Sequence, residues 1–205
     1  MSKRIDFYFD FTSPYGYFAS TVINELASKY NHQVDWHPYV REEFKPSNSG
    51  TGLSQIPAKL KYQKRDIIRT AQFENIPYKE PSVVTLDARY AARAVLWVES
   101  TYGEARGIEF AQAILRAYHV EDKNISDTQT ITTIAQTIGL NPEDVLVGIS
   151  NASTREQFRA EVDLATAKGV FGSPFFILDG EPFWGFDRMA QLEAALKRKE
   201  TSENA

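Results

Sequence analysis

The chain contains no cysteine. This absence excludes structural disulfides, thiolate metal sites, cysteine nucleophiles and any redox cycle run by the protein's own thiols. A disulfide oxidoreductase is therefore excluded, and any thiol chemistry carried out here must come from a bound ligand.

Histidine is scarce as well, and its three positions do not suggest a metal site. His32, His37 and His119 lack the HExxH pattern or any comparable spacing of zinc ligands. His37 precedes Pro38 at the end of a predicted strand, which favours a structural role, and the other two are predicted at the surface or at helix ends. We therefore expect no metal ion.

Long apolar runs and blocks of one charge are also missing. The formal net charge is −4 with both signs interspersed, whereas nucleic-acid binding needs a concentrated Lys/Arg footprint. No run has the length of a membrane span, and Asp6 lies where a signal peptide would need apolar residues. We expect a soluble, cytoplasmic protein that binds neither nucleic acid nor membranes.

The N-terminal segment predicts a strand–helix–strand unit. Residues Ile5–Phe11 alternate and are rich in aromatic types, which predicts a strand. Ser13 then stands at the N-cap of a helix over Tyr15–Tyr30, with Pro14 at its first position. A second short strand is predicted over Val34–His37.

The centre of the chain predicts helices. Pro, Ser, Asn and Gly between Glu43 and Thr51 indicate a loop, after which apolar residues recur at helical spacing. Helices are predicted near Lys59–Phe73, Ala88–Val95, Ala111–Tyr118, Thr128–Ile138, Pro142–Ile149 and Thr154–Lys168.

The C-terminal part returns to strands. Two runs, Pro174–Leu178 and Glu181–Trp184, are separated by an Asp-Gly pair, which is a strong hairpin signal. Asp187 is predicted to cap a last amphipathic helix, and Lys197–Ala205 is predicted to be a frayed polar tail.

Ser13 is the first residue with chemical potential. Unpaired N–H groups and the positive dipole end at a helix start stabilise a thiolate, and the Ser13 hydroxyl would add a donor that lowers the pKa of a bound thiol. An ordinary helix cap explains the same serine. Ser13 is a poor candidate for a nucleophile, because no histidine or lysine lies nearby in the sequence to activate it.

Two further segments could bind a ligand. A cis bond before Pro174 would turn the backbone of Ser173 toward a groove that can pair with an extended peptide, although a proline on an edge strand is the structural alternative. A cap is a sufficient explanation of Asp187, but the same helix start would suit a ligand carboxylate, with the Asp187 side chain meeting an ammonium.

Four segments together resemble the 2-hydroxychromene-2-carboxylate isomerase family, a relative of kappa-class glutathione transferases and DsbA-type oxidoreductases. They are FDFTSPY at 9–15, Lys59-x-x-Tyr62-x-x-x-Asp66, GVFGSPFF at 169–176 and FWGFDR at 183–188. The resemblance extends over essentially the whole chain. It implies an α/β thioredoxin fold made by residues 1–41 and 166–205, an inserted helical domain over 42–165, and usually a homodimer.

The resemblance also implies a glutathione site. Ser13 would hold the glutathione sulfur, and Pro174 would be cis, with the backbone of Ser173 paired to the cysteinyl part. Asp187 and its helix start would take the γ-glutamyl end, while Lys59 would reach the ligand from the insert.

The substrate side is less closely matched. Many members carry an Asn before the insert helix, whereas this chain reads VTLD at 84–87. Phe11, Tyr15 and Trp184 would suit a flat aromatic substrate beside Lys59, with ordinary core packing as the alternative for these aromatics.

Three functions are therefore in competition. The first is a glutathione-dependent isomerase of 2-hydroxychromene-2-carboxylate-like compounds in aromatic catabolism, which adds and then eliminates the thiolate. The second is a kappa-class-like transferase that keeps the conjugate and shares every glutathione contact. The third is a non-catalytic thioredoxin-fold binding protein, which the presence of Ser13, Lys59 and Asp187 together argues against.

Overall fold

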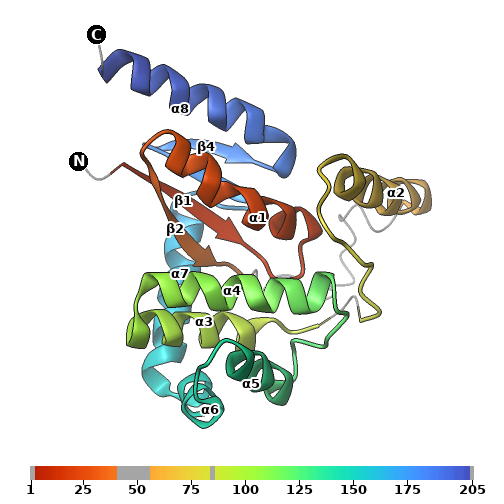
Figure 1. Ribbon diagram of the computed structural model, residues 1–205, viewed down its shortest axis with the longest axis vertical. Helices are drawn as coiled ribbons and strands as arrows, with labels where there is room; N and C mark the ends of the chain where they lie inside the picture. The colour runs from red at the N-terminus through yellow and green to blue at the C-terminus, as the bar shows by residue number, and fades with distance from the viewer. Residues whose placement is uncertain (1–2, 41–55, 84–85, 204–205) are drawn as a thin grey trace.

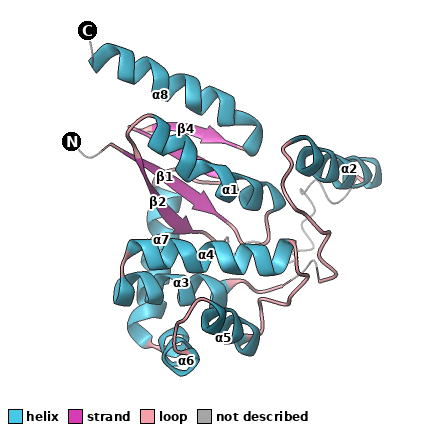
Figure 2. Ribbon diagram, viewed as in Figure 1, coloured by secondary structure: helices cyan, strands magenta, loops and turns pink. Residues whose placement is uncertain are grey.

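A four-stranded mixed sheet in the order β2-β1-β3-β4 forms the centre of the computed structural model, which describes residues 3–40, 56–83 and 86–203 (Figures 1 and 2). β1 (Arg4–Phe9) runs parallel to β2 (Gln33–Pro38) and antiparallel to β3 (Phe175–Leu178). β4 (Glu181–Trp184) pairs antiparallel with β3 at the edge of the sheet. The predicted thioredoxin fold is confirmed, with the strand–helix–strand unit first, the helices next and the strand–strand–helix unit last.

Helices cover both faces of this sheet. α1 (Pro14–Lys29) and α8 (Met189–Glu203) lie on one face, and α7 (Ala152–Ala167) passes behind the other (Figure 1). Side chains alternate along a strand, so Phe7 and Phe9 join the main core while Tyr8 packs with the α7 side. Both faces of β1 are therefore buried.

The six helices predicted for the centre of the chain are all present, although the second continues to Tyr102 rather than Val95 and the third begins at Glu104 rather than Ala111. The first of them, α2, stands apart from the others in Figure 1, and the predicted loop at Glu43–Thr51 lies outside the described residues. Their bounds are Pro57–Phe73 (α2), Arg89–Tyr102 (α3), Glu104–His119 (α4), Thr128–Thr137 (α5), Pro142–Ser150 (α6) and Ala152–Ala167 (α7).

One hydrophobic core joins the sheet to α3 and α4. Phe7 and Phe9 belong to the same buried cluster as Ala91 of α3 and Ile114 of α4. Burial of such side chains stabilises the fold by about 1.5–3 kcal/mol each. The helices between β2 and β3 are thus packed onto the strands, and a division into residues 1–41 plus 166–205 and residues 42–165 stays a prediction.

Two further predicted boundaries were wrong. β1 ends at Phe9 rather than Phe11, because the Asp10 carboxylate accepts the Thr12 N–H at 2.8 Å and the Asp10 carbonyl accepts the Ser13 N–H at 3.0 Å, which forms a turn. The expected frayed tail is helical to Glu203, in line with the buried α8 residue Leu196 two turns earlier.

Two of the three histidines are buried, and the third, His37, is half-buried. His32 and His119 lie at helix ends as one alternative predicted, but they are 8% and 1% exposed, so neither is a surface residue. His37 has the predicted structural role: its Nε2 lies 3.3 Å from Asp6 of β1, and its Nδ1 lies 3.1 Å from Glu161 of α7. Burial lowers the pKa of His37, but these two carboxylates outweigh burial and raise it to about 9.

Candidate functional site

Ser13 begins α1 with the predicted cap geometry. Its backbone is extended (φ −83°, ψ 115°), and its Oγ accepts a hydrogen bond from the Gly16 N–H at 3.1 Å. The same Oγ donates to the Ser173 carbonyl at 3.1 Å, and Pro14 follows at the start of the helix. The cap is therefore confirmed, and its hydroxyl also joins α1 to the loop before β3.

The loop before β3 packs directly against the start of α1. The Ser173–Pro174 peptide bond is cis, as the resemblance implied. The Asp10 N–H donates to Ser173 Oγ at 2.8 Å, and a Cβ added to Gly16 would lie 2.6 Å from that oxygen. Glycine is required at position 16 because the loop and the helix approach this closely.

Asp187 does not cap the last helix, so that prediction was wrong. It lies inside a one-turn 3₁₀ helix, η3 (Phe186–Arg188), which follows Gly185 at φ 105°, and α8 begins only at Met189. The Gly185 N–H donates to the Pro174 carbonyl at 2.9 Å, which ties this turn to the cis-proline loop. The Asp187 side chain is 72% exposed and pairs with its neighbour Arg188.

Tyr15 links the start of α1 to α2. Its hydroxyl donates to Asp66 at 2.6 Å, and burial together with this hydrogen bond raises the pKa of Tyr15. Residues three and four apart share a helix face, so Lys59, Tyr62 and Asp66 line the face of α2 that meets Tyr15. Lys59 is exposed and lies about 10 Å along the helix from Asp66.

The predicted pocket aromatics do not form one wall. Phe11 is fully buried in the main core, 5.2 Å from the ring of Phe9, so it offers no surface to a ligand. Phe11 is therefore an ordinary core residue, which was the alternative to a role in the substrate pocket. Tyr15 remains half-buried beside α2.

Trp184 lies on the outer side of the cis-proline loop. Its register opposite Phe175 places it on the α7 side of the sheet, and it is 54% exposed. Its ring lies 4.9 Å from Phe171, and its indole nitrogen would lie 2.4 Å from a Cβ added to Gly172. Trp184 thus covers the backbone next to Ser173.

Asp87 makes local contacts. Its carboxylate accepts hydrogen bonds from the Arg89 backbone N–H at 3.0 Å and from the Arg89 side chain, which lower the pKa of Asp87. Val84 and Thr85 lie outside the described residues.

These segments match a known family as one unit. The family model described as a DSBA-like thioredoxin domain matches residues 4–197. The chain belongs to this family.

Curated relatives of this DSBA-like chain include proteins named as isomerases and proteins named as glutathione transferases. A 2-hydroxychromene-2-carboxylate isomerase from Sphingobium xenophagum is 28% identical over 96% of this chain and 99% of its own. A glutathione S-transferase kappa 2 from Caenorhabditis elegans is 24% identical over 93% of this chain and 90% of its own. The solved structure of a 2-hydroxychromene-2-carboxylate isomerase has a TM-score of 0.85 at 24% identity, covers 98% of this chain and 99% of that chain, and shares the fold.

Sequence reasoning missed two residues that build this DSBA-like site. Asp10 contributes its backbone N–H to Ser173 and its carbonyl to Ser13, and burial raises the pKa of its carboxyl group. Gly16 permits the close approach of the loop. A glycine near a helix start, where it destabilises by about 1 kcal/mol relative to alanine, was the available signal.

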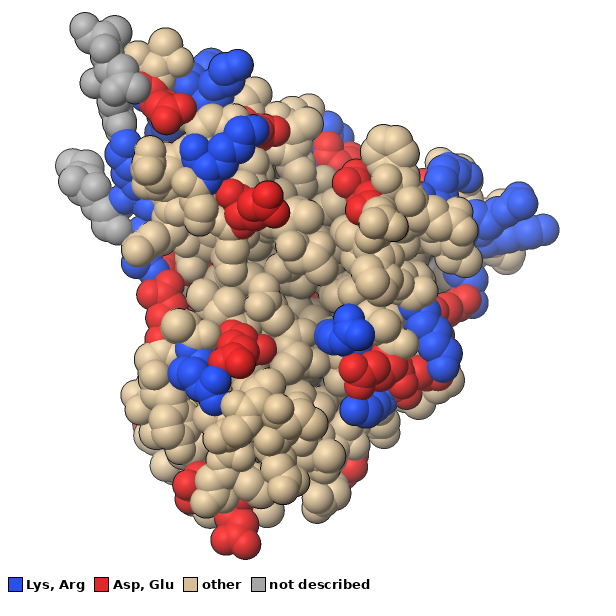
Figure 3. Space-filling model, in the orientation of Figure 1, with Lys and Arg blue, Asp and Glu red and all other residues tan. Residues whose placement is uncertain are grey.

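The α2 side of the DSBA-like domain is cationic. Its sequence, PAKLKYQKRDIIRTAQF, holds five Lys and Arg residues and one acidic residue. Figure 3 shows these basic side chains gathered at the α2 end of the molecule. Lys64 pairs with Glu80 and Arg69 pairs with Asp66, and the remaining excess of positive charge attracts anions.

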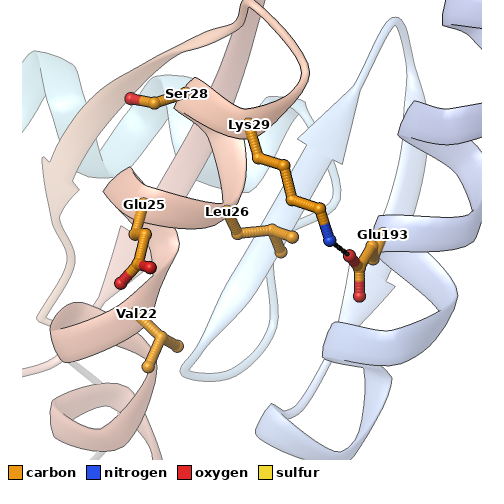
Figure 4. A pocket seen from close by; sticks show the side chains of 6 residues that line it. All are labelled: Val22, Glu25, Leu26, Ser28, Lys29 and Glu193. Carbon is orange, nitrogen blue, oxygen red and sulfur yellow. Dashed lines mark hydrogen bonds and ion pairs between the residues drawn. The ribbon is translucent and has the colours of Figure 1, made fainter.

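A groove between α1 and α8 is separate from Ser13. It measures about 580 Å³, and the Lys29–Glu193 ion pair at 2.6 Å crosses it (Figure 4). Its α1 residues begin at Val22, about 13 Å along the helix from Ser13. Within residues 3–40, 56–83 and 86–203, no cluster of three or more acidic or histidine side chains could hold a metal ion. No helix in the same ranges is long and apolar enough to cross a membrane.

Proposed function

We propose that this protein is a glutathione-dependent isomerase of 2-hydroxychromene-2-carboxylate-like substrates in aromatic-compound catabolism. The observation that carries the proposal is Ser13 Oγ at the start of α1, bonded to the loop that contains the cis bond before Pro174. Relatives named as this isomerase and as kappa-class glutathione transferases support the same assignment. We also propose that it works in the cytoplasm as a homodimer.

The residues around Ser13 fit a bound thiolate. The start of α1 contributes N–H groups and the positive end of its dipole. Because the chain has no cysteine, a sulfur bound at this position would have to come from a ligand. Bound glutathione would supply the thiolate that adds to the substrate and leaves again after bond rotation, so it would not be consumed. Ser13 would hold that sulfur by turning its O–H from the Ser173 carbonyl to the stronger, charged acceptor.

The remaining contacts would hold the peptide parts of glutathione. The Ser173 carbonyl, once released by Ser13, would accept the cysteinyl N–H, and the cis bond before Pro174 supports this role. The exposed Asp187 carboxylate would meet the γ-glutamyl ammonium, and Lys59 on α2 would meet a carboxylate.

Reduced glutathione should bind and stabilise the folded protein. At about a hundred times its Kd, a ligand selective for the native state adds about 2.7 kcal/mol, which raises the melting temperature. Titration calorimetry and thermal unfolding with glutathione, against glycine as a control zwitterion, measure this. Absence of binding at millimolar glutathione would contradict the proposed function.

The products separate the isomerase from a transferase. Both would use the same glutathione contacts, and the relative named as a kappa-class glutathione transferase makes the transferase the alternative function. Chromatography of a reaction between a 2-hydroxychromene-2-carboxylate and catalytic glutathione should show the isomer with no loss of free thiol. Stoichiometric loss of thiol into a conjugate would assign a transferase.

Lys59→Ala should lower kcat/KM for a carboxylated aromatic substrate by about tenfold, because a charge-assisted hydrogen bond between the exposed ammonium and the substrate carboxylate is lost. The comparison is with the uncharged analogue of that substrate at saturating glutathione. Lys61→Ala and Lys64→Ala are matched controls on the same helix, and Lys64 already pairs with Glu80 at 2.6 Å. Equal losses on both substrates would assign Lys59 to glutathione alone, and no loss would make it an ordinary surface lysine.

A further inference from the structure

His119 contacts the backbone of the loop that carries Ser13. It is the last residue of α4, and Figure 1 shows this end of α4 on the same side of the molecule as the start of α1. Its Nε2 lies 2.9 Å from the carbonyl oxygen of Phe11. Phe11 stands two residues before Ser13, within the turn that ends β1.

The protonation of His119 follows from this contact. A carbonyl only accepts, so Nε2 must carry the hydrogen and Nδ1 must carry the lone pair. Nδ1 is buried and has no hydrogen-bond partner among the described residues. Burial lowers the pKa of His119 to about 3, so the ring is a neutral donor at physiological pH. It is shielded from solvent and is therefore not placed to exchange protons with a substrate.

The ring is clamped from several elements. It stacks on Tyr17 of α1 at 5.0 Å and meets the edge of Tyr118 at 4.7 Å, and the His119 carbonyl accepts the Lys79 N–H at 2.7 Å. A donor fixed in this way holds the carbonyl of Phe11, and with it the turn, in one place. Two other backbone groups of the turn are also bound: the Thr12 N–H donates to the Asp10 carboxylate, and the Asp10 N–H donates to Ser173 Oγ.

We infer that His119 is a positioning residue: its Nε2–H sets the place of Ser13 Oγ by fixing the Phe11 carbonyl. This inference rests on the proposed function, because the consequence of misplacing Ser13 is a weaker hold on the glutathione thiolate. Displacement of a reacting group by about 1 Å reduces rates by about a hundredfold. The role is in geometry alone, and the ring touches neither substrate nor sulfur.

The variants separate this role from plain packing. His119→Phe keeps an aromatic ring at this position but removes the hydrogen-bond donor. His119→Gln keeps a donor near the position of Nε2, whereas His119→Asn places a donor nearer the position of Nδ1. Tyr17→Phe is the matched control, because it removes another hydrogen bond to a backbone carbonyl, Tyr17 to Pro77 at 2.8 Å, from the same aromatic cluster.

The measurement is the pKa of the bound glutathione thiol, read from thiolate ultraviolet absorbance, together with kcat at saturating glutathione and the melting temperature. We expect His119→Phe to raise the thiol pKa and lower kcat by about ten- to a hundredfold, and His119→Gln to restore most of both. Tyr17→Phe should lower the melting temperature and leave the thiol pKa unchanged.

Two results would overturn the inference: an unchanged thiol pKa in His119→Phe, or equal thiol pKa changes in His119→Phe and Tyr17→Phe. If His119→Phe does not fold, the pair His119→Gln and His119→Asn decides, and equal thiol pKa values in those two variants would also overturn it. Failure of the wild-type protein to bind glutathione would instead count against the proposed function, and calorimetry on the wild type shows this first.

Discussion

Ser13→Ala should reduce glutathione-dependent turnover by about a hundredfold or more while leaving the fold nearly intact. Removal of one hydrogen-bond donor from a charge-stabilising site costs about 10²–10³ in kcat. Loss of a helix cap costs only about 1 kcal/mol of stability. The two effects differ in size because the hydroxyl meets a neutral carbonyl in the unliganded protein and a charged sulfur in the complex.

A second N-cap provides the control for this prediction. Asn141 caps α6 by accepting the Glu143 N–H at 2.9 Å, and α6 belongs to the helical part of the chain rather than to the turn around Ser13. Asn141→Ala should therefore lower the melting temperature about as much as Ser13→Ala and leave turnover unchanged. A bound-thiol pKa that Ser13→Ala does not raise would return Ser13 to the role of an ordinary cap.

Raising the pH from 6.5 to 9.5 should destabilise the fold by about 3 kcal/mol through His37. Burial opposes the charge on His37, but hydrogen bonds with Asp6 and Glu161 raise its pKa to about 9, above the unfolded value of 6.5. The stabilisation is therefore fully present below pH 6.5 and is lost as the pH rises through 9. Lys168 also pairs with Asp6 at 2.7 Å, and Glu99 faces the same cluster from α3.

Denaturant unfolding at a series of pH values tests this prediction. Cysteine, which would titrate in the same window, does not occur in the chain. His37→Gln should be less stable than wild type at pH 6.5 and should lose most of the slope between pH 6.5 and 9.5. A wild-type stability that stays flat across this window would contradict the assignment.

The sequence on its own predicted the order of elements and the local start of the site. Strand alternation, helical periodicity and the Asp-Gly hairpin are signals within short segments of the chain. The predictions based on them therefore did not depend on how distant segments pack. The cap at Ser13 followed for the same reason, since a helix start depends on its own few residues. The absence of cysteine fixed the chemical limit, because no fold can supply a thiol that the chain does not contain.

Only the tertiary structure decided which side chains meet. The prediction that Asp187 caps α8 failed because Gly185 adopts a positive φ and a 3₁₀ turn precedes α8. The local sequence does not distinguish such a turn from a helix cap. Phe11 is in the core because the turn after β1 points it inward, and sequence cannot tell a core aromatic from a pocket aromatic. The contact of His119 with Phe11 joins residues 108 positions apart. Such contacts depend on how α4 packs across the sheet, and no periodicity within a single segment encodes that packing.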